Sequence, residues 1–295
     1  MSLSRGTAST NRLSGSIYFS AHPADSLLFQ TPDLYHDLYV YKCVTTVFFT
    51  SGDRGITGNS SQSLERGVEN AYSYLAERTI DETAWKESRL LVDNNSILIR
   101  ALKYAPYVQN VYLRLPNGAP DGQGYTAHGG ESLKKLYTKK IKNVTAIDNS
   151  ATYTLESLKD LIATVIRQRL AQDVRVLDYK TPIPHDNADP NEYDHADHSI
   201  SARIVVDVME QEKLMGALRG YAGHLMRTLE PNLHAPQADH DIKSDALLHY
   251  SIYDKHMCKR FKRCVSRAKQ TTTEDVLDND AKHVMTWLQR EYYVR

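Results

Sequence analysis

Ser16-Ile-Tyr-Phe-Ser-Ala-His-Pro-Ala-Asp25 is the segment that sets the architecture of this 295-residue chain. Its apolar run Ile17-Tyr-Phe19 is β-prone, and proline cannot continue a central strand. The sequence therefore predicts a strand over 16–21 that stops at His22-Pro23. Polar side chains, among them His22 and Asp25, are expected at the carboxyl tip of this strand.

Strands and helices alternate in the rest of the chain. Apolar runs predict strands over 40–50, 108–115 and 173–178, and helical spacing predicts helices over 63–78, 155–170 and 199–212, with weaker helical patterns at 244–255 and 280–290. This order is typical of an α/β fold, here a Rossmann-like, mostly parallel sheet with helices on both faces. Such sheets bind ligands outside the carboxyl ends of their strands, so an active site is expected there.

One domain accounts for most of the chain. Residues 1–15 are rich in Ser, Thr, Arg and Gly and are predicted to form a flexible N-terminal segment. The remainder contains no internal repeat, low-complexity tract or linker, so residues 16–295 are predicted to form a single domain that we expect to be a monomer.

The charge balance excludes two classes of partner. The chain carries 36 Lys and Arg against 36 Asp and Glu, which gives no field to draw it onto nucleic acid or an anionic membrane. No stretch approaches the roughly 18 apolar residues that a membrane helix requires. We therefore expect neither nucleic acid nor a membrane span.

Two short histidine motifs are candidates for chemistry. His22-Pro-Ala-Asp25 follows the first strand, and His195-Ala-Asp-His198 opens a predicted helix. Catalytic zinc takes three protein ligands and leaves one position for water, and two His with one carboxylate is a standard set. His22, Asp25 and one of His195 and His198 would meet that need.

Other candidate sites are weaker. His234 with Asp239-His-Asp241 lies in a Pro-rich stretch that no strand precedes, and we interpret it as a solvated loop. The chain has no phosphate-binding glycine motif and no G-x-S-x-G nucleophile elbow. Cys43 is predicted to lie in the middle of a strand, where it is no obvious nucleophile. Metal-activated water remains as the chemistry that the residues favour.

Five ordered motifs resemble those of the PIG-L/LmbE family of zinc-dependent de-N-acetylases. Ala21-His-Pro-Ala-Asp25 resembles the family's AHPDD segment, and Thr50-Ser-Gly-Asp-Arg-Gly55 resembles its TxGDxG segment. Arg66-Gly-Val-Glu69 resembles R-x-x-E, and Leu115-Pro-Asn-Gly118 resembles LPDG. Tyr193-Asp-His-Ala-Asp-His198 resembles the Tyr-x-His-x-Asp-His segment. Further stretches, such as Asp25-Ser-Leu-Leu-Phe29 and Asp121-Gly-Gln-Gly124, resemble the fungal and actinobacterial branch, which is often secreted. The resemblance implies removal of an acetyl group from an N-acetylglucosamine-type sugar or glycoconjugate.

The resemblance also implies roles at the metal. His22, Asp25 and His198 would hold one Zn²⁺ per chain, and the cation would lower the pKa of its water from about 15.7 to about 7. His195 would be a protonated partner that stabilises charge or delivers a proton to the leaving amine, oriented by Asp197. Tyr193 would help to hold the oxyanion, unless it only packs its loop.

Substrate contacts follow from the same motifs. The resemblance places Asp53 and Arg54 among the substrate-binding residues, and Arg66 would bind sugar hydroxyls unless it only pairs with Glu69. Asn117 stands where the family usually has Asp, which exchanges a charge for an amide at a substrate-binding position.

The family's catalytic base is missing. Its first Asp of the AHPDD pair takes a proton from the zinc water, and here Ala24 occupies that position. General-base catalysis is typically worth about 10²–10⁴-fold. We interpret Ala24 as an engineered inactivation of a hydrolase, with a natural pseudoenzyme as the second explanation. The alternative function is a non-catalytic sugar-binding protein that retains the metal pocket.

The sequence does not decide the cellular compartment of the protein. The chain would follow the secretory pathway if a leader has been removed, and it would be cytoplasmic otherwise. Cys258 and Cys264 are close enough in sequence to form a local disulfide, but three cysteines do not decide the redox environment.

Overall fold

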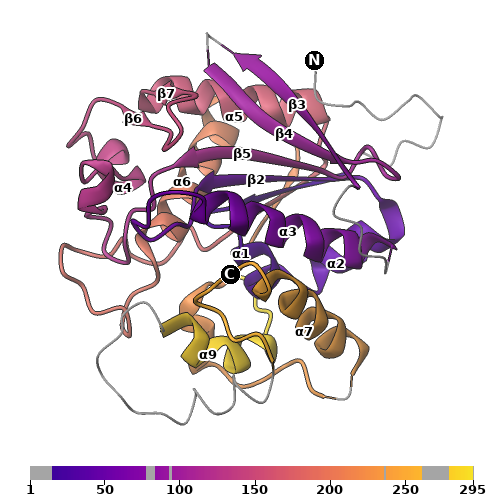
Figure 1. Cartoon of the computed structure of the whole chain (residues 1–295). Helices are drawn as coiled ribbons and strands as arrows, with labels where there is room; N and C mark the ends of the chain where they lie inside the picture. The colour runs from indigo at the N-terminus through magenta and orange to yellow at the C-terminus, as the bar shows by residue number, and fades with distance from the viewer. Residues whose placement is uncertain (1–14, 78–83, 93–94, 236, 261–278, 295) are drawn as a thin grey trace.

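The computed structural model describes residues 15–77, 84–92, 95–235, 237–260 and 279–294 (Figure 1). Apart from Gly15, the predicted flexible segment 1–15 lies outside the described residues, as does Cys264. Cys258 is disulfide-bonded and Cys43 is a free thiol. No helix in the described ranges is long and apolar enough to cross a membrane.

A mixed seven-stranded sheet forms the centre of the molecule and confirms the predicted α/β class. Its strands run in the spatial order β3-β4-β5-β2-β1-β8-β9. β5, β2, β1, β8 and β9 are parallel, whereas β3 and β4 form an antiparallel hairpin against β5. In chain order the strands are β1 (Ser16–Ser20), β2 (Val44–Thr50), β3 (Trp85–Val92), β4 (Asn95–Leu102), β5 (Gln109–Leu115), β8 (Asp173–Val176) and β9 (Ala217–Gly220).

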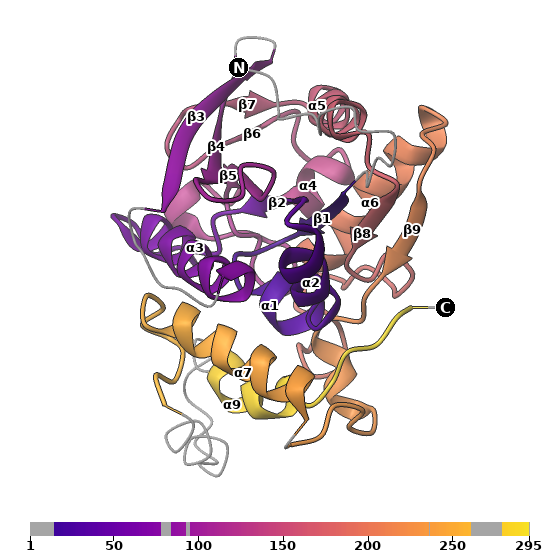
Figure 2. The ribbon, with the colours of Figure 1, turned by 90° about the vertical axis from the view of Figure 1, so that its right-hand side faces the viewer.

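Helices cover both faces of the sheet (Figure 2). α1 (Asp25–Phe29) and α3 (Ser60–Glu77) lie on one side, and α5 (Leu155–Arg169) and α6 (Ala196–Gln211) lie on the other. α7 (Ala238–Ser251) and α9 (Asn279–Leu288) form an outer layer, since α7 packs on α3 and both helices pack on α1. Every residue of β1, β2 and β5 is buried, as expected for central strands covered on both faces.

Short elements complete the fold. They are α2 (Asp33–His36), a π-helix over Asp37–Tyr41, α4 (Leu133–Tyr137), the hairpin of β6 (Val144–Thr145) and β7 (Thr152–Tyr153), and 3₁₀ helices over Thr126–His128 and His224–Thr228.

The chain changes direction across the sheet between β1 and β8. From β1 it passes outward through β2 to the β5 side, and it later returns to add β8 and β9 on the opposite flank of β1. Ligands of parallel sheets bind at such a switch point, outside the carboxyl ends of the two strands concerned. The segment that begins at Ala21 leaves β1 there, and the connection from β8 to α6 lies beside it.

Two local predictions were wrong, and a hairpin was missed. The strand predicted over 40–50 starts at Val44, because the preceding residues form the π-helix, and Cys43 therefore precedes the strand instead of lying within it. Asp239-His-Asp241 belongs to the first turn of α7, not to a loop. The β3–β4 hairpin was not predicted, because β3 is an edge strand whose charged, exposed residues hide the apolar alternation.

A buried ion pair fixes α3 against the end of β5. The guanidinium of Arg114 donates to both carboxylate oxygens of Glu65, at 2.6 and 2.7 Å, and to Asp148 at 2.6 Å. Both side chains are at least nine-tenths buried. The pair therefore locates the segment after β5, which carries Asn117 and Gly118, relative to α3.

Removing one partner of this pair should destabilise the fold. We expect Glu65→Gln to lower the free energy of unfolding by about 3 kcal/mol, because the substitution leaves a buried charge without its main partner. This value is at the low end of the usual cost, since Arg114 still pairs with Asp148. Urea unfolding measures the change, and Glu210→Gln at an exposed position of α6 is the control, expected to stay within about 0.5 kcal/mol. Equal stability of the two variants would contradict this role for the pair.

Candidate metal centre

Asp25 lies between two imidazoles at the switch point. Its Oδ2 is 3.1 Å from Nδ1 of His22, and its Oδ1 is 3.3 Å from Nε2 of His198. The backbone N–H of His22 also donates to Oδ2 of Asp25 at 2.7 Å, which holds the carboxylate at the start of α1. β1 thus delivers two of the residues and the N-terminus of α6 delivers the third.

Two further carboxylates lie behind the histidines. Asp194 accepts a hydrogen bond from Nδ1 of His198 at 3.0 Å, and Asp197 lies 3.2 Å from Nε2 of His22. All three aspartates are buried, Asp197 completely. Buried carboxylates need positive charge close by, which here comes from protonated imidazoles or from a bound cation.

The pKa values follow this charge pattern. Burial lowers the pKa of His22, but the Asp25 carboxylate and hydrogen bonds to Asp197 and Asp25 together raise it to about 9. Burial likewise opposes the charged form of His198, yet Asp25 and Asp194 hold its pKa well above the usual range. Burial raises the pKa of Asp25, and the two imidazoles more than offset this and hold it well below the usual range.

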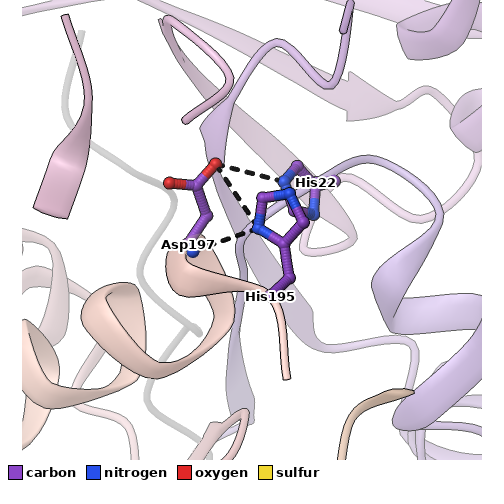
Figure 3. Close-up of side chains that lie close together, drawn as sticks. All are labelled: His22, His195 and Asp197. Carbon is purple, nitrogen blue, oxygen red and sulfur yellow. Dashed lines mark hydrogen bonds and ion pairs between the residues drawn. The ribbon is translucent and has the colours of Figure 1, made fainter. Parts of the chain in front are cut away.

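His195 stands apart from the other two histidines. Its Nδ1 accepts the backbone N–H of Asp197 at 3.1 Å, so that nitrogen carries no proton (Figure 3). Burial and the neighbouring imidazoles of His22, His198 and His224 hold its pKa well below the usual range. In this arrangement His195 is neutral, whereas the family resemblance implies a protonated partner.

The carboxylate of Asp197 faces His22 more closely than His195. Its Oδ2 is 3.2 Å from Nε2 of His22 but 3.9 Å from Nδ1 of His195, and it also accepts the backbone N–H of Gly118 at 2.8 Å. The carboxylate thus lies near both imidazoles and closer to His22, and its predicted role in orienting His195 stays a prediction. The backbone N–H of Asp197 orients His195, because His195 is the N-cap of α6.

The donor set fits a metal ion. One ligand atom from each of His22, Asp25 and His198 lies within 4.8 Å of the other two. Two overlapping groups meet the same distance limit. They are His22 with His195 and Asp197, and Asp194 with His198 and His224. Among the described residues, Nε2 of the fully buried His198 has no hydrogen-bond partner, although Asp25 is close. Two imidazole nitrogens and one carboxylate oxygen suit zinc in a site that keeps one position open.

A cleft of about 910 Å³, counting the space open to solvent, extends from this centre. His22, Ala24, Asp25 and His195 line it, as do Leu28, Leu64, His224 and Asp254, with three prolines and three tyrosines: Pro23, Pro120, Pro190, Tyr125, Tyr193 and Tyr250. A metal held by His22 and Asp25 would therefore face a partly apolar, aromatic cavity that is open to small molecules.

The structure brings two of the four predicted substrate residues to this cleft, together with Tyr193. Arg54, Asn117 and Tyr193 line it, with Asn117 buried and its side-chain oxygen accepting the N–H of Ala119. Asp53 lies in the adjoining depression instead, where it hydrogen-bonds His128 at 2.6 Å.

Arg66 is the second predicted substrate residue that does not line the cleft. It is exposed on α3 and is absent from the described lining residues, and Glu69 pairs with Arg100 at 2.7 Å. Two residues along a helix turn the side chain by about 200°, so Leu64 faces the cleft while Arg66 points elsewhere. The alternative interpretation, a pairing of Arg66 with Glu69, is therefore not seen among the described residues, and the substrate contact of Arg66 stays a prediction.

Sequence reasoning missed two members of the site, Asp194 and His224. The only signal for Asp194 is its place four residues before His198. His224 follows β9, a strand that was not predicted, and its ring stacks on Trp287 with the centroids 4.8 Å apart. His36, outside the site, is an exposed group that pairs with Asp239.

Comparisons with known proteins identify no family for this chain. No protein-family model and no curated protein matches it. A solved structure described as the conserved protein TT1542 from Thermus thermophilus is similar at 15% sequence identity and a TM-score of 0.41, over 80% of this chain and 78% of that chain.

Zinc binding tests this donor set. We expect the purified protein to bind about one zinc per chain, and His198→Ala to remove most of that zinc, because the substitution deletes a buried ligand. Metal analysis after dialysis measures the content. His36→Ala, at an exposed histidine, is the matched control and should leave the zinc content unchanged. Retention of zinc by His198→Ala would contradict this assignment.

Proposed function

We propose that this protein is a zinc-dependent de-N-acetylase scaffold of the PIG-L/LmbE type that binds an N-acetylated amino sugar or glycoconjugate. The observation that carries the proposal is the convergence of His22, Asp25 and the buried His198 at the switch point of a parallel sheet, where His22 and Asp25 line an aromatic cleft. These are the three residues that the motif resemblance assigns to the metal.

The residues around the metal suit amide hydrolysis. Zinc bound by His22, Asp25 and His198 would activate water and polarise the acetyl carbonyl. His195 lines the cleft, and because its Nδ1 accepts a hydrogen bond, its proton is on Nε2. From there neutral His195 can donate a hydrogen bond to the developing oxyanion. Tyr193, half-buried in the cleft wall, supplies a second donor.

The step that this chain performs poorly is removal of the water proton. Ala24 lines the cleft directly before Asp25, and its methyl group accepts no proton. Asp25 is engaged by both imidazoles, and Asp197 is completely buried and does not line the cleft, so neither carboxylate replaces the missing base. We therefore propose that the hydrolytic activity of this chain is low and that its ligand binding is intact.

A sugar-binding protein without catalysis is the second candidate. The observation that favours it is the same methyl group at the base position, in a cleft whose tyrosine rings and polar groups suit a sugar. Both candidates bind the same ligand, and they differ in whether restoring the base restores turnover.

Restoring the carboxylate separates the two candidates. We expect Ala24→Asp to raise the rate of acetate release from N-acetylhexosamine compounds by about 10²–10⁴-fold, the usual contribution of a general base. Ala24→Asn, which has nearly the same shape and cannot take a proton, should stay at the level of the wild type. The double substitution Ala24→Asp/His198→Ala should lose the gain. An absence of acetate release by Ala24→Asp across a broad panel would favour the binding protein.

Two arginines test the position of the ligand. Arg54 lines the cleft and Arg66 does not, so Arg54→Ala should weaken binding of N-acetylglucosamine-type ligands about tenfold, or about 1.4 kcal/mol, while Arg66→Ala leaves it unchanged. Calorimetric titration of the zinc-loaded protein measures both affinities. Equal loss in the two variants, or loss only in Arg66→Ala, would place the ligand elsewhere.

A further inference from the structure

Each histidine of the proposed zinc site has one nitrogen toward Asp25 and the other toward a second buried carboxylate. For His198 the two nitrogens are Nε2, 3.3 Å from Asp25, and Nδ1, 3.0 Å from Asp194. For His22 they are Nδ1, 3.1 Å from Asp25, and Nε2, 3.2 Å from Asp197. The two rings therefore use opposite nitrogens toward the centre, and each has a carboxylate at its back.

Asp194 is fixed in place by the backbone. Its Oδ1 accepts the N–H of His195 at 2.8 Å and the N–H of His224 at 3.0 Å, besides the imidazole of His198. It is 4% exposed, so solvent competes little for these bonds. Gly223 lets the carboxylate approach this closely, because a Cβ at that residue would lie 2.2 Å from Oδ2 of Asp194.

Asp197 is fixed in a similar way. Its Oδ2 accepts the N–H of Gly118 at 2.8 Å. The same oxygen faces Nε2 of His22, as Figure 3 shows. The side chain is fully buried, and a Cβ on Gly118 would lie 2.4 Å from its Oδ1. Gly223 and Gly118, which lie on different loops, thus leave room for the carboxylates of Asp194 and Asp197.

We propose that Asp194 and Asp197 are positioning residues that select which nitrogen of each histidine binds the metal. Asp194 holds the proton of His198 on Nδ1 and leaves Nε2 for the cation, and Asp197 holds the proton of His22 on Nε2 and leaves Nδ1. The inference rests on the proposed zinc site and assigns Asp197 to His22 in place of His195. Such carboxylate partners fix the orientation of ligand imidazoles and increase their basicity.

The test is the zinc affinity of isosteric variants. We expect Asp194→Asn and Asp197→Asn each to raise the dissociation constant for zinc about 10–100-fold, measured by competition with a chromophoric chelator. An asparagine oxygen can still accept the backbone N–H groups, so the fold should survive, and thermal unfolding of the metal-free variants checks this. Asp160→Asn, at an exposed position of α5, is the control and should bind zinc like the wild type.

Imidazole ¹⁵N spectra of the zinc-loaded protein separate positioning from a general structural effect. In the wild type, we expect protonated Nδ1 on His198 and protonated Nε2 on His22. Asp194→Asn should alter only the His198 signals, and Asp197→Asn only those of His22.

The outcomes distinguish this inference from the function on which it rests. If the wild type binds no zinc, both are overturned. If it binds zinc and the two variants keep the affinity of the wild type, or if zinc is found on Nδ1 of His198, only the positioning role is overturned. Should a variant fail to fold, the wild-type spectrum alone decides, since zinc on Nδ1 of His198 or on Nε2 of His22 contradicts the inference.

Discussion

The burial of negative charge at the carboxyl ends of β1 and β8 is the constraint on which this structure depends. Asp25, Asp194 and Asp197 are all inside the protein, and imidazoles lie against each of them. A carboxylate in such surroundings is costly unless it is paired or bound to a cation. Without a metal, protons on His22 and His198 supply the compensating charge, and a divalent cation would supply it with the protons released.

The rest of the fold places these groups within reach of one another. The sheet changes direction between β1 and β8, which brings the residues after β1 beside the start of α6. The ion pair of Glu65 with Arg114 holds the loop that contains Gly118, and Gly118 in turn anchors Asp197. Stability and site geometry are therefore connected through one chain of contacts.

The sequence predicted the central strands, and it named His22, Asp25 and one of His195 and His198 as candidate ligands, because both are local signals. Apolar runs mark β1, β2 and β5, and His22, Asp25 and His198 lie in two short motifs at strand and helix ends. It did not predict the hairpin at the sheet edge, where charged exposed residues dominate. It also missed His224, whose place depends on how β9 pairs with β8, and it gave no sign that Arg66 lies outside the lining of the cleft. These features depend on tertiary contacts that no short window of sequence contains.

Ala24 separates metal binding from catalysis in the proposed function. The groups that would hold zinc and bind a ligand are in place, and the group that would take the proton from water is absent from this position. The central claim is thus the metal site itself. Anomalous diffraction at the zinc edge, from crystals grown with zinc, tests it most directly. The account predicts one zinc within about 2.0–2.2 Å of Nδ1 of His22, a carboxylate oxygen of Asp25 and Nε2 of His198. A peak among Asp194, His198 and His224 instead, or no peak at the switch point, would contradict it.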